Sequence, residues 1–321
     1  MAEPASAFQA LDHALAAAVA AAGPGVVHVA RGHHQGGSGI VWAPDLVLST
    51  SFHTPDRTVV GVPTDDGELQ GSGAPGPRSV AEGRREGSID RRDAEVIGRD
   101  PGTDVALLRV TGAPLTPATF REIDGLAVGN LALALGRPGR SVRASLRAIG
   151  VLGGALKTPH GGTLDRYVES DRQIPRGFAG GPLVDGAGAV VGMNTRTLVR
   201  GADVAVTVAT LRRVVAELVA HGGVRKGYLG VAAVPVQLPA AIAQAVGRER
   251  GALVAAVEDG AAAAAAGLAV GDLVVEIGGA AVTGPESLRD AIHGRPGDAV
   301  TVVVYRAGAK AELAATIGSR S

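Results

Sequence analysis

The sequence contains no cysteine, which excludes disulfide bonds and thiolate metal sites as supports of the fold. Aromatic residues are scarce, with four phenylalanines, three tyrosines and one tryptophan among 321 residues. Net charge is absent too, because 31 lysines and arginines balance 31 aspartates and glutamates. Bulk attraction to nucleic acid or to an anionic membrane is therefore not expected.

Long apolar runs are also missing: none approaches the roughly 20 residues that a membrane span needs. The segment Met1–Pro4 lacks the basic residues of a secretory signal. We therefore expect the chain as written to be cytoplasmic. A periplasmic or secreted protein whose export signal had been removed would look the same.

Apolar residues make up 46% of the chain, which is enough for the cores of two or three domains. Residues 1–24 are predicted to hold an N-terminal helix, because Phe8, Leu11 and Leu15 recur at helical spacing before Gly23-Pro24. From 25 to 223, short apolar strands separated by glycine and proline turns predict an antiparallel β barrel or sandwich. Within it, residues 67–93 have almost no apolar anchors and predict a mobile surface insertion.

A domain boundary is predicted at Gly222-Gly223, which follow an amphipathic helix from Ala209 to His221. In residues 224–321 the pattern predicts strands near 273–277 and 300–305. It also predicts two short helices, one from Asp259, as its cap, to Ala266 and one over 285–293. This pattern predicts a small α+β domain over residues 224–321.

A glycine-rich loop, Gly177-Phe178-Ala179-Gly180-Gly181-Pro182, precedes an apolar run. Small residues let the chain turn tightly and expose backbone N–H groups, as an oxyanion loop does. His53 follows one apolar strand and Asp104 begins another, so the order is histidine, aspartate and loop, as in the chymotrypsin triad. A histidine at a strand end is usually structural, so the interpretation depends on the three features together.

At these residues the chain resembles the HtrA, or Deg, serine proteases. The likeness is carried by Gly37–Val41, Ala94–Leu108, Leu126–Asn130 and Gly180–Val184, and it extends from about Val26 to Ile317. The stretch from Glu95 to Leu108 is its specific part. The resemblance implies a mainly β fold: a chymotrypsin-like double β-barrel over 25–223, followed by one small α+β PDZ domain over 224–321.

The resemblance implies that His53 is the general base and Asp104 the carboxylate that orients it. Ala179 occupies the position of the nucleophilic serine, and the backbone N–H groups of Gly177 and Ala179 would form the oxyanion hole. The strand that pairs with substrate would contain Asn194, Thr195 and Arg196. Because an alanine side chain has no reactive atom, the chain as written is expected to be inactive. The neighbours of His53, Phe52 and Thr54-Pro55, depart from the family's small and aliphatic residues.

In the second domain the resemblance implies a PDZ peptide-binding site, whose loop binds a C-terminal carboxylate while the next strand pairs with the peptide. Its residues would be Tyr228, Leu229, Gly230, Val231, Leu288 and Ile292. The implied partners are unfolded polypeptides and protein C-termini, and no metal or organic cofactor is implied. A homotrimer, common in the family and based on aromatic contacts near the N-terminus, would depend on Phe8.

Two explanations of Ala179 stay open. Serine was exchanged for alanine to trap an inactive form, or the chain is a natural pseudoprotease that binds peptides as a chaperone or scaffold. A pure PDZ adaptor is disfavoured, because the large protease-like region would then have no role. An active family member would favour apolar P1 side chains here, since Gln173 provides no carboxylate six residues before Ala179.

Overall fold

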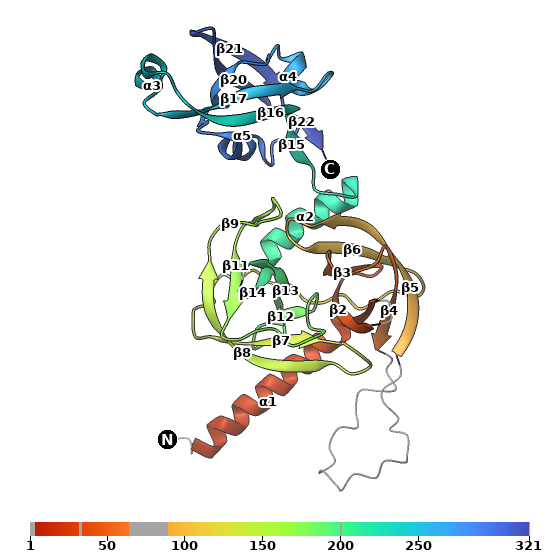
Figure 1. Cartoon of the computed structure of the whole chain (residues 1–321). Coiled ribbons are helices and arrows are strands. Elements are labelled where there is room, and N and C mark those ends of the chain that lie inside the picture. The colour runs from red at the N-terminus through yellow and green to blue at the C-terminus, as the bar shows by residue number, and fades with distance from the viewer. Residues whose placement is uncertain (1–3, 32–33, 64–88, 200, 321) are drawn as a thin grey trace. The chain divides into compact units, whose positions relative to one another are not determined.

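The computed structural model describes residues 4–31, 34–63, 89–199 and 201–320. The chain divides into two compact units, Met1–Gly223 and Val224–Ser321, which we describe separately. Strands dominate both units, and helices are few (Figure 1). The mainly β fold predicted from the sequence is confirmed.

Six strands form the first barrel of unit 1. They are β1 (Val26–Arg31), β2 (His34–Ala43), β3 (Leu46–Thr50), β4 (Arg57–Pro63), β5 (Ile89–Asp100) and β6 (Val105–Val110). They close in the order β1-β2-β3-β6-β5-β4, with antiparallel neighbours. Successive side chains of a strand face opposite sides, so alternate residues such as Val27 and Val29 fill the barrel core.

A second closed barrel follows in the same unit (Figure 1). Its strands are β7 (Leu131–Gly136), β8 (Arg143–Gly153), β11 (Tyr167–Ser170), β12 (Pro182–Val184), β13 (Val190–Val199) and β14 (Ala202–Thr207), in the order β11-β14-β13-β12-β7-β8. The short strands β9 (Leu156–Lys157) and β10 (Thr163–Leu164) pair separately. Two closed barrels in sequence are the chymotrypsin-like architecture.

Helices begin and end unit 1. Helix α1 (Pro4–Ala22) leads through a 3-10 turn, η1 (Gly23–Gly25), into β1. Its C-terminal part is buried at Ala18 and Ala22, whereas residues 6–14 are exposed. Helix α2 (Val208–His221) ends at Gly222, whose φ of 70° is left-handed and whose N–H donates to the Leu218 carbonyl over 2.9 Å.

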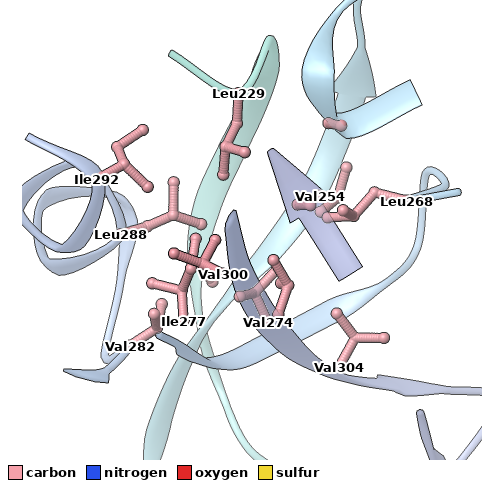
Figure 2. Packing of buried hydrophobic residues seen from close by; sticks show 14 of the residues in the cluster. Leu229, Val254, Leu268, Val274, Ile277, Val282, Leu288, Ile292, Val300 and Val304 are labelled. Carbon is pink, nitrogen blue, oxygen red and sulfur yellow. The ribbon is translucent and has the colours of Figure 1, made fainter. Parts of the chain in front are cut away.

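Unit 2 is a small α+β unit with one apolar core. Its elements are β15 (Lys226–Tyr228), β16 (Val231–Gln237), α3 (Ala240–Val246), β17 (Arg250–Val257), α4 (Ala262–Ala265), β18 (Leu273–Ile277), β19 (Ala280–Ala281), α5 (Pro285–Ile292), β20 (Ala299–Arg306), β21 (Ala309–Thr316) and β22 (Gly318–Arg320). The sheet runs β16-β17-β18-β20-β21, with β19 beside β18, and β15 pairs with β22. Figure 2 shows the aliphatic core between this sheet and α5.

Three local expectations differ from the structure. Residues 89–93, predicted to belong to the insertion, lie in β5 and pair with β4 from Val59 to Pro63. Backbone pairing needs no apolar side chain, so this charged segment gave no strand signal. The rest of the expected insertion, 67–88, lies outside the described residues.

The other two differences concern helices of unit 2. Helix α4 spans only Ala262–Ala265, and its N-cap residue is Ala261, so the predicted cap at Asp259 is wrong. Helix α3, over Ala240–Val246, was not predicted. Alanine favours helix without a distinctive pattern, so short alanine-rich helices are hard to delimit from the sequence.

Candidate active site

Asp104 is a buried carboxylate that joins the two barrels. Its Oδ1 accepts the backbone N–H of Phe52, after β3 of the first barrel, over 3.0 Å. Its Oδ2 accepts the hydroxyls of Thr195 and Thr197, both in β13 of the second barrel, the latter over 2.7 Å. The side chain is fully buried, and three hydrogen bonds offset the cost of burying its charge.

The backbone at Asp104 has a φ of 54°, in the left-handed region that few non-glycine residues adopt. The preceding turn supports this conformation, because Asp100 accepts the Gly102 N–H over 3.0 Å and the Thr103 hydroxyl over 2.6 Å. The Thr158 hydroxyl holds the Gly102 carbonyl over 2.6 Å. Asp104 is thus positioned by the loop before it as well as by its own partners.

His53 lies exposed in a turn after β3 that is fixed on both sides. Phe52 is held by Asp104, and the Thr54 hydroxyl donates to Ser49 Oγ over 3.2 Å. The Arg99 guanidinium donates to the carbonyls of Ser51, over 2.7 Å, and Thr54. Two of the three residues that depart from the family's usual neighbours, Phe52 and Thr54, therefore take part in fixing the turn.

The glycine-rich loop turns twice within seven residues. Phe178 N–H donates to the Pro175 carbonyl over 3.1 Å, and Gly181 N–H donates to the Phe178 carbonyl over 2.9 Å. Gly180 has a φ of 87°, and a Cβ there would lie 2.3 Å from the Ser38 carbonyl oxygen. Only glycine fits this position. The bond to the Phe178 carbonyl also sets the direction of the Ala179 N–H, because both groups belong to one peptide plane.

Ser38, in β2, clamps this loop to the first barrel. Its fully buried hydroxyl donates to the Gly177 carbonyl over 2.6 Å and accepts the Arg137 N–H over 2.8 Å. Its own N–H donates to the Ala179 carbonyl over 3.3 Å. The carbonyls of Gly177 and Ala179 therefore both face Ser38.

The three residues expected on the substrate strand make different contacts. Asn194 holds the loop, with its N–H on the Gly181 carbonyl over 2.9 Å and its carbonyl on the Gly180 N–H over 2.8 Å. Thr195 is buried and holds Asp104. Arg196 is exposed. Strand β12 pairs with β13 only as far as Met193, and the loop before β12 bonds to Asn194, so among the described residues no strand pairs with β13 on that side beyond Asn194.

A second carboxylate, that of Asp203, lies beside the segment that precedes the glycine-rich loop, and the local sequence of that segment did not predict it. Asp203, in β14, accepts the N–H of Ile174, the residue after Gln173, over 2.6 Å. Arg196 Nε lies 3.6 Å from the same carboxylate oxygen. On the other side of this segment, the buried Arg147 donates to the Gln173 carbonyl over 3.0 Å, and burial lowers the pKa of its guanidinium. The segment before the loop is therefore surrounded by charge.

In unit 2 the side chain of Tyr228, in the predicted carboxylate-binding loop, is held by hydrogen bonds to Glu258 and Arg320. The Tyr228 hydroxyl donates to Glu258, a bond that raises the pKa of the tyrosine. Arg320 donates to the same hydroxyl over 3.2 Å and lies 5.0 Å from the ring centroid. Gly230 has a φ of 77°, and a Cβ there would lie 2.2 Å from the Ala261 Cβ. This position also requires glycine.

Three of the predicted groove residues belong to the core of unit 2. Leu229, Leu288 and Ile292 are 1%, 6% and 5% exposed, and Figure 2 shows them close together between the loop and α5. Val231 begins β16 and packs on the same cluster while half-buried.

Four residues that connect the histidine turn, the aspartate and the glycine-rich loop were not predicted from the sequence: Ser38, Arg99, Thr197 and Asp203. Ser38 and Arg99 lie inside stretches that carry the family resemblance, but their partners are far away in the chain. No described helix combines the length and the apolar character that crossing a membrane requires. Among the residues with a described position, no group of three His, Asp or Glu side chains could hold a metal ion.

Two family models match the chain: a trypsin-like peptidase domain over residues 37–193 and a PDZ domain over 227–317. Together with the two barrels, these matches define the class as a trypsin-like peptidase followed by a PDZ domain. Within that class, the chain belongs to the HtrA, or DegP-like, family of serine endoproteases.

Similar proteins support this assignment. The chain is 29% identical over 238 residues to a probable periplasmic serine endoprotease DegP-like of Brucella suis, with 71% of this chain and 45% of the relative covered. It is 32% identical over 236 residues to the protein of that name in Ectopseudomonas mendocina, covering 71% and 49%. The chain spans about half the length of the curated relatives it matches.

Solved structures show the same fold. The HtrA-type protease AlgW with a decapeptide has a TM-score of 0.67 at 24% identity, covering 96% of this chain and 99% of that one. AlgW with a tripeptide has a TM-score of 0.65 at 27% identity, covering 96% and 97%.

Proposed function

We propose that this chain is an HtrA-type serine endopeptidase for unfolded or misfolded protein, present in a catalytically inactive form. The observation that carries the proposal is the environment of Asp104. This carboxylate holds the turn of His53 through Phe52 and is held by Thr195, next to a loop whose nucleophile position is Ala179.

The proposed roles follow from that arrangement. With serine at position 179, the hydroxyl oxygen would attack the substrate carbonyl carbon while His53 takes its proton, and Asp104 would stabilise the resulting imidazolium. The N–H groups of Gly177 and Ala179 would stabilise the oxyanion. The residues after Asn194 in β13 would pair with the substrate backbone, because beyond Asn194, whose backbone groups bond to the glycine-rich loop, no described strand pairs with that edge.

The alternative is a natural pseudoprotease that binds unfolded polypeptide as a chaperone or scaffold. It is favoured by the same loop, whose backbone groups are held by hydrogen bonds from Ser38 and Asn194. Binding through backbone groups needs no nucleophile, so this function would survive with Ala179.

The Ala179→Ser variant distinguishes the two functions. Loss of the nucleophile lowers turnover about 10⁶-fold in a well-studied serine protease. The endopeptidase proposal therefore predicts that the unmodified chain does not hydrolyse casein measurably and that Ala179→Ser hydrolyses it readily. The control is Ala179→Ser combined with His53→Ala, which should be silent again. If Ala179→Ser stays silent while the unmodified chain binds casein in a pull-down, the pseudoprotease function is supported instead.

Peptide binding by unit 2 is also proposed, since the PDZ model matches residues 227–317 and two HtrA-type neighbours were solved with peptides. We propose unfolded polypeptides and protein C-termini as partners, and a homotrimer through the exposed half of α1. Of the locations considered above, which were the cytoplasm, the periplasm and the exterior, we propose the periplasm, because the relatives are named as periplasmic proteins. Fractionation of the source cells with an antibody to the chain tests that location.

A further inference from the structure

Unit 1 contains a basic cavity of about 640 Å³, whose lining includes none of the residues assigned to the candidate active site. Both barrels contribute to the lining: β1 and β5 of the first barrel provide His28, Ile89 and Arg91, and the β7–β8 turn and the start of β8 provide Arg140, Ser141 and Arg143. None of the described lining residues is acidic. Three guanidinium groups, each permanently charged, therefore line one cavity. Its volume lies within the range of about 300–1,000 Å³ that is usual for small-ligand sites.

The first-barrel side of the cavity is a row of residues on three adjacent strands. His28 of β1 pairs with Gly61 of β4, and Gly61 pairs with Arg91 of β5. Paired residues of neighbouring strands present their side chains on the same face of a sheet. A Cβ on Gly61 would lie 2.9 Å from Ile89 Cδ1 and 3.1 Å from His28 Cβ. The glycine therefore keeps open the space between His28 and Arg91.

The acidic residue beside Arg91 in the sequence is bound on another face of the strand. Successive side chains of a strand face opposite sides of the sheet, so Asp90 faces away from Ile89 and Arg91. Its carboxylate accepts a hydrogen bond from Arg92 Nε over 2.8 Å. Asp90 therefore does not neutralise the charge of the cavity.

A buried arginine fixes the turn that forms the second-barrel side. The side chain of Arg137 donates to the Val26 carbonyl over 2.7 Å and to the Arg140 carbonyl over 2.7 Å, and the residue is 2% exposed. The Arg137 carbonyl accepts the Nδ1–H of His28 over 3.1 Å. These bonds connect the two sides of the cavity, so little ordering is left for a ligand to impose.

We propose that this basic cavity binds a short chain of linked phosphate groups, of which inorganic tripolyphosphate is the simplest. Guanidinium groups form bidentate, charge-assisted hydrogen bonds to phosphate oxygens. Three of them around one cavity suit several linked phosphates better than one ion, and the Ser141 hydroxyl provides a further donor. Among the described lining residues only Ile89 has an apolar side chain, so the site offers little to the organic part of a nucleotide.

An acidic polypeptide segment carries similar charge but fits the cavity less well. On the first-barrel side, β1, β4 and β5 each pair with two neighbours in a closed barrel, so a peptide cannot add to them as a strand. It would bind through flexible side chains, whose ordering lowers the affinity. A basic surface that is solvated and binds no ligand is the plainest alternative. The three possibilities differ in saturation and in the preferred anion.

The first experiment is calorimetric titration of the full chain with tripolyphosphate at low ionic strength, where charge attraction is least screened. We expect saturable binding of about one ligand per chain, at least tenfold tighter than the binding of inorganic phosphate or of a hexaglutamate peptide. A ligand of the folded state also raises the unfolding temperature. Trp42, the single tryptophan, lies in β2 of unit 1, so its fluorescence should report that rise.

Two variants test the cavity, one by charge and one by shape. The double variant Arg91→Gln, Arg143→Gln should weaken tripolyphosphate binding tenfold or more, as the loss of hydrogen bonds from charged groups implies. Gly61→Val keeps every charge but fills the space between His28 and Arg91, and it should weaken binding to a similar extent. The matched control is Arg57→Gln, which removes an exposed arginine of β4 that does not line the cavity. Its affinity should change less than twofold.

Several outcomes would overturn this proposal. One is the absence of saturable tripolyphosphate binding by the unmodified chain, which no variant is needed to establish. Another is equal weakening in the double variant and in Arg57→Gln, because the attraction would then depend on charge alone. Tighter binding of hexaglutamate than of tripolyphosphate would assign the cavity to an acidic polypeptide instead. If Gly61→Val does not fold, the double variant and its control decide the matter. None of these measurements depends on hydrolysis of casein, so the proposed endopeptidase function is tested separately.

Discussion

At the scale of single residues, the candidate site depends on buried hydrogen bonds more than on the residues that would do chemistry. Asp104 is held by Thr195 and Thr197, and the loop of Ala179 is held by Ser38. Each of these hydroxyls donates to a buried or half-buried acceptor, and loss of a partner from such a group costs about 1–3 kcal/mol. The atom that decides activity is a side-chain oxygen that Ala179 lacks.

Thr195→Val tests the support of Asp104. The change keeps the side-chain shape but removes a donor from a fully buried carboxylate, so we expect the free energy of unfolding to fall by about 1–3 kcal/mol. Urea denaturation followed through Trp42, which lies in unit 1, measures it. Thr116→Val, at an exposed position, is the control. Equal stability of the two variants would show that Thr195 does not support the carboxylate.

At the scale of elements, hydrogen bonds between side chain and backbone connect segments that packing alone leaves loose. In unit 2 the end of β20 is tied to the turn before β18. Arg306 donates to both oxygens of Asp272, over 2.7 and 2.8 Å, and the Ala269 N–H donates to the same carboxylate over 2.8 Å. The side chain of Asp272 is 1% exposed, so this pair is sheltered on its acidic side.

The hydrogen bonds from Arg306 lower the pKa of Asp272 below its usual value, with the Ala269 bond helping and burial opposing. Because the pKa is lower in the folded than in the unfolded state, this group stabilises unit 2 above about pH 4. That stability is lost as the pH falls through the folded pKa. Asp272→Asn should therefore destabilise unit 2 near pH 7 and weaken the decline in stability on acidification.

Hydrogen exchange of peptides from residues 250–306, followed by mass spectrometry from pH 3 to 7 with correction for intrinsic rates, measures this effect. The control is Asp298→Asn, which removes a half-exposed partner of Arg295 and should change protection little. A decline in protection below pH 4 that is the same in Asp272→Asn as in the unmodified chain would contradict the role of this carboxylate.

At the scale of the whole molecule, the exposed half of α1 carries large apolar side chains on the surface of a single copy. Phe8 is 73% exposed and Leu11 is 41% exposed, whereas the other end of the helix is buried at Ala18. Large apolar side chains grouped on one helix mark a contact surface more often than a solvent face. This grouping supports the proposed homotrimer.

Light scattering after size-exclusion chromatography tests the trimer. We expect about three times the chain mass of 32.0 kDa, and a shift to the monomer mass in the double variant Phe8→Ser, Leu11→Ser. The control is Val270→Ser, which removes an exposed apolar side chain from unit 2 and should leave the mass unchanged. A monomer mass for the unmodified chain at protein concentrations of tens of micromolar would contradict the proposed homotrimer.

Much of the fold could be predicted because it depends on local patterns. Alternating apolar residues and glycine turns indicated the barrels, and Gly222 ended α2 as its position suggested. The predictions that were wrong fell where local pattern is weak, in the charged start of β5 and in the alanine-rich helix α4. In the site, Gln173 itself provides no carboxylate, but Asp203 of another strand accepts the N–H of the neighbouring Ile174, which the local sequence does not indicate.

The amino-acid sequence by itself determined the mainly β architecture, the HtrA family and the absence of an oxygen at position 179, because these follow from residue identity and local order. Only the tertiary structure decided what holds the site together. Ser38 reaches Gly177 across 139 residues, and Thr195 reaches Asp104 across 91. Such partners depend on how barrels and strands align in space, and a hydrogen bond that forms or fails within a few tenths of an ångström leaves no pattern in the sequence.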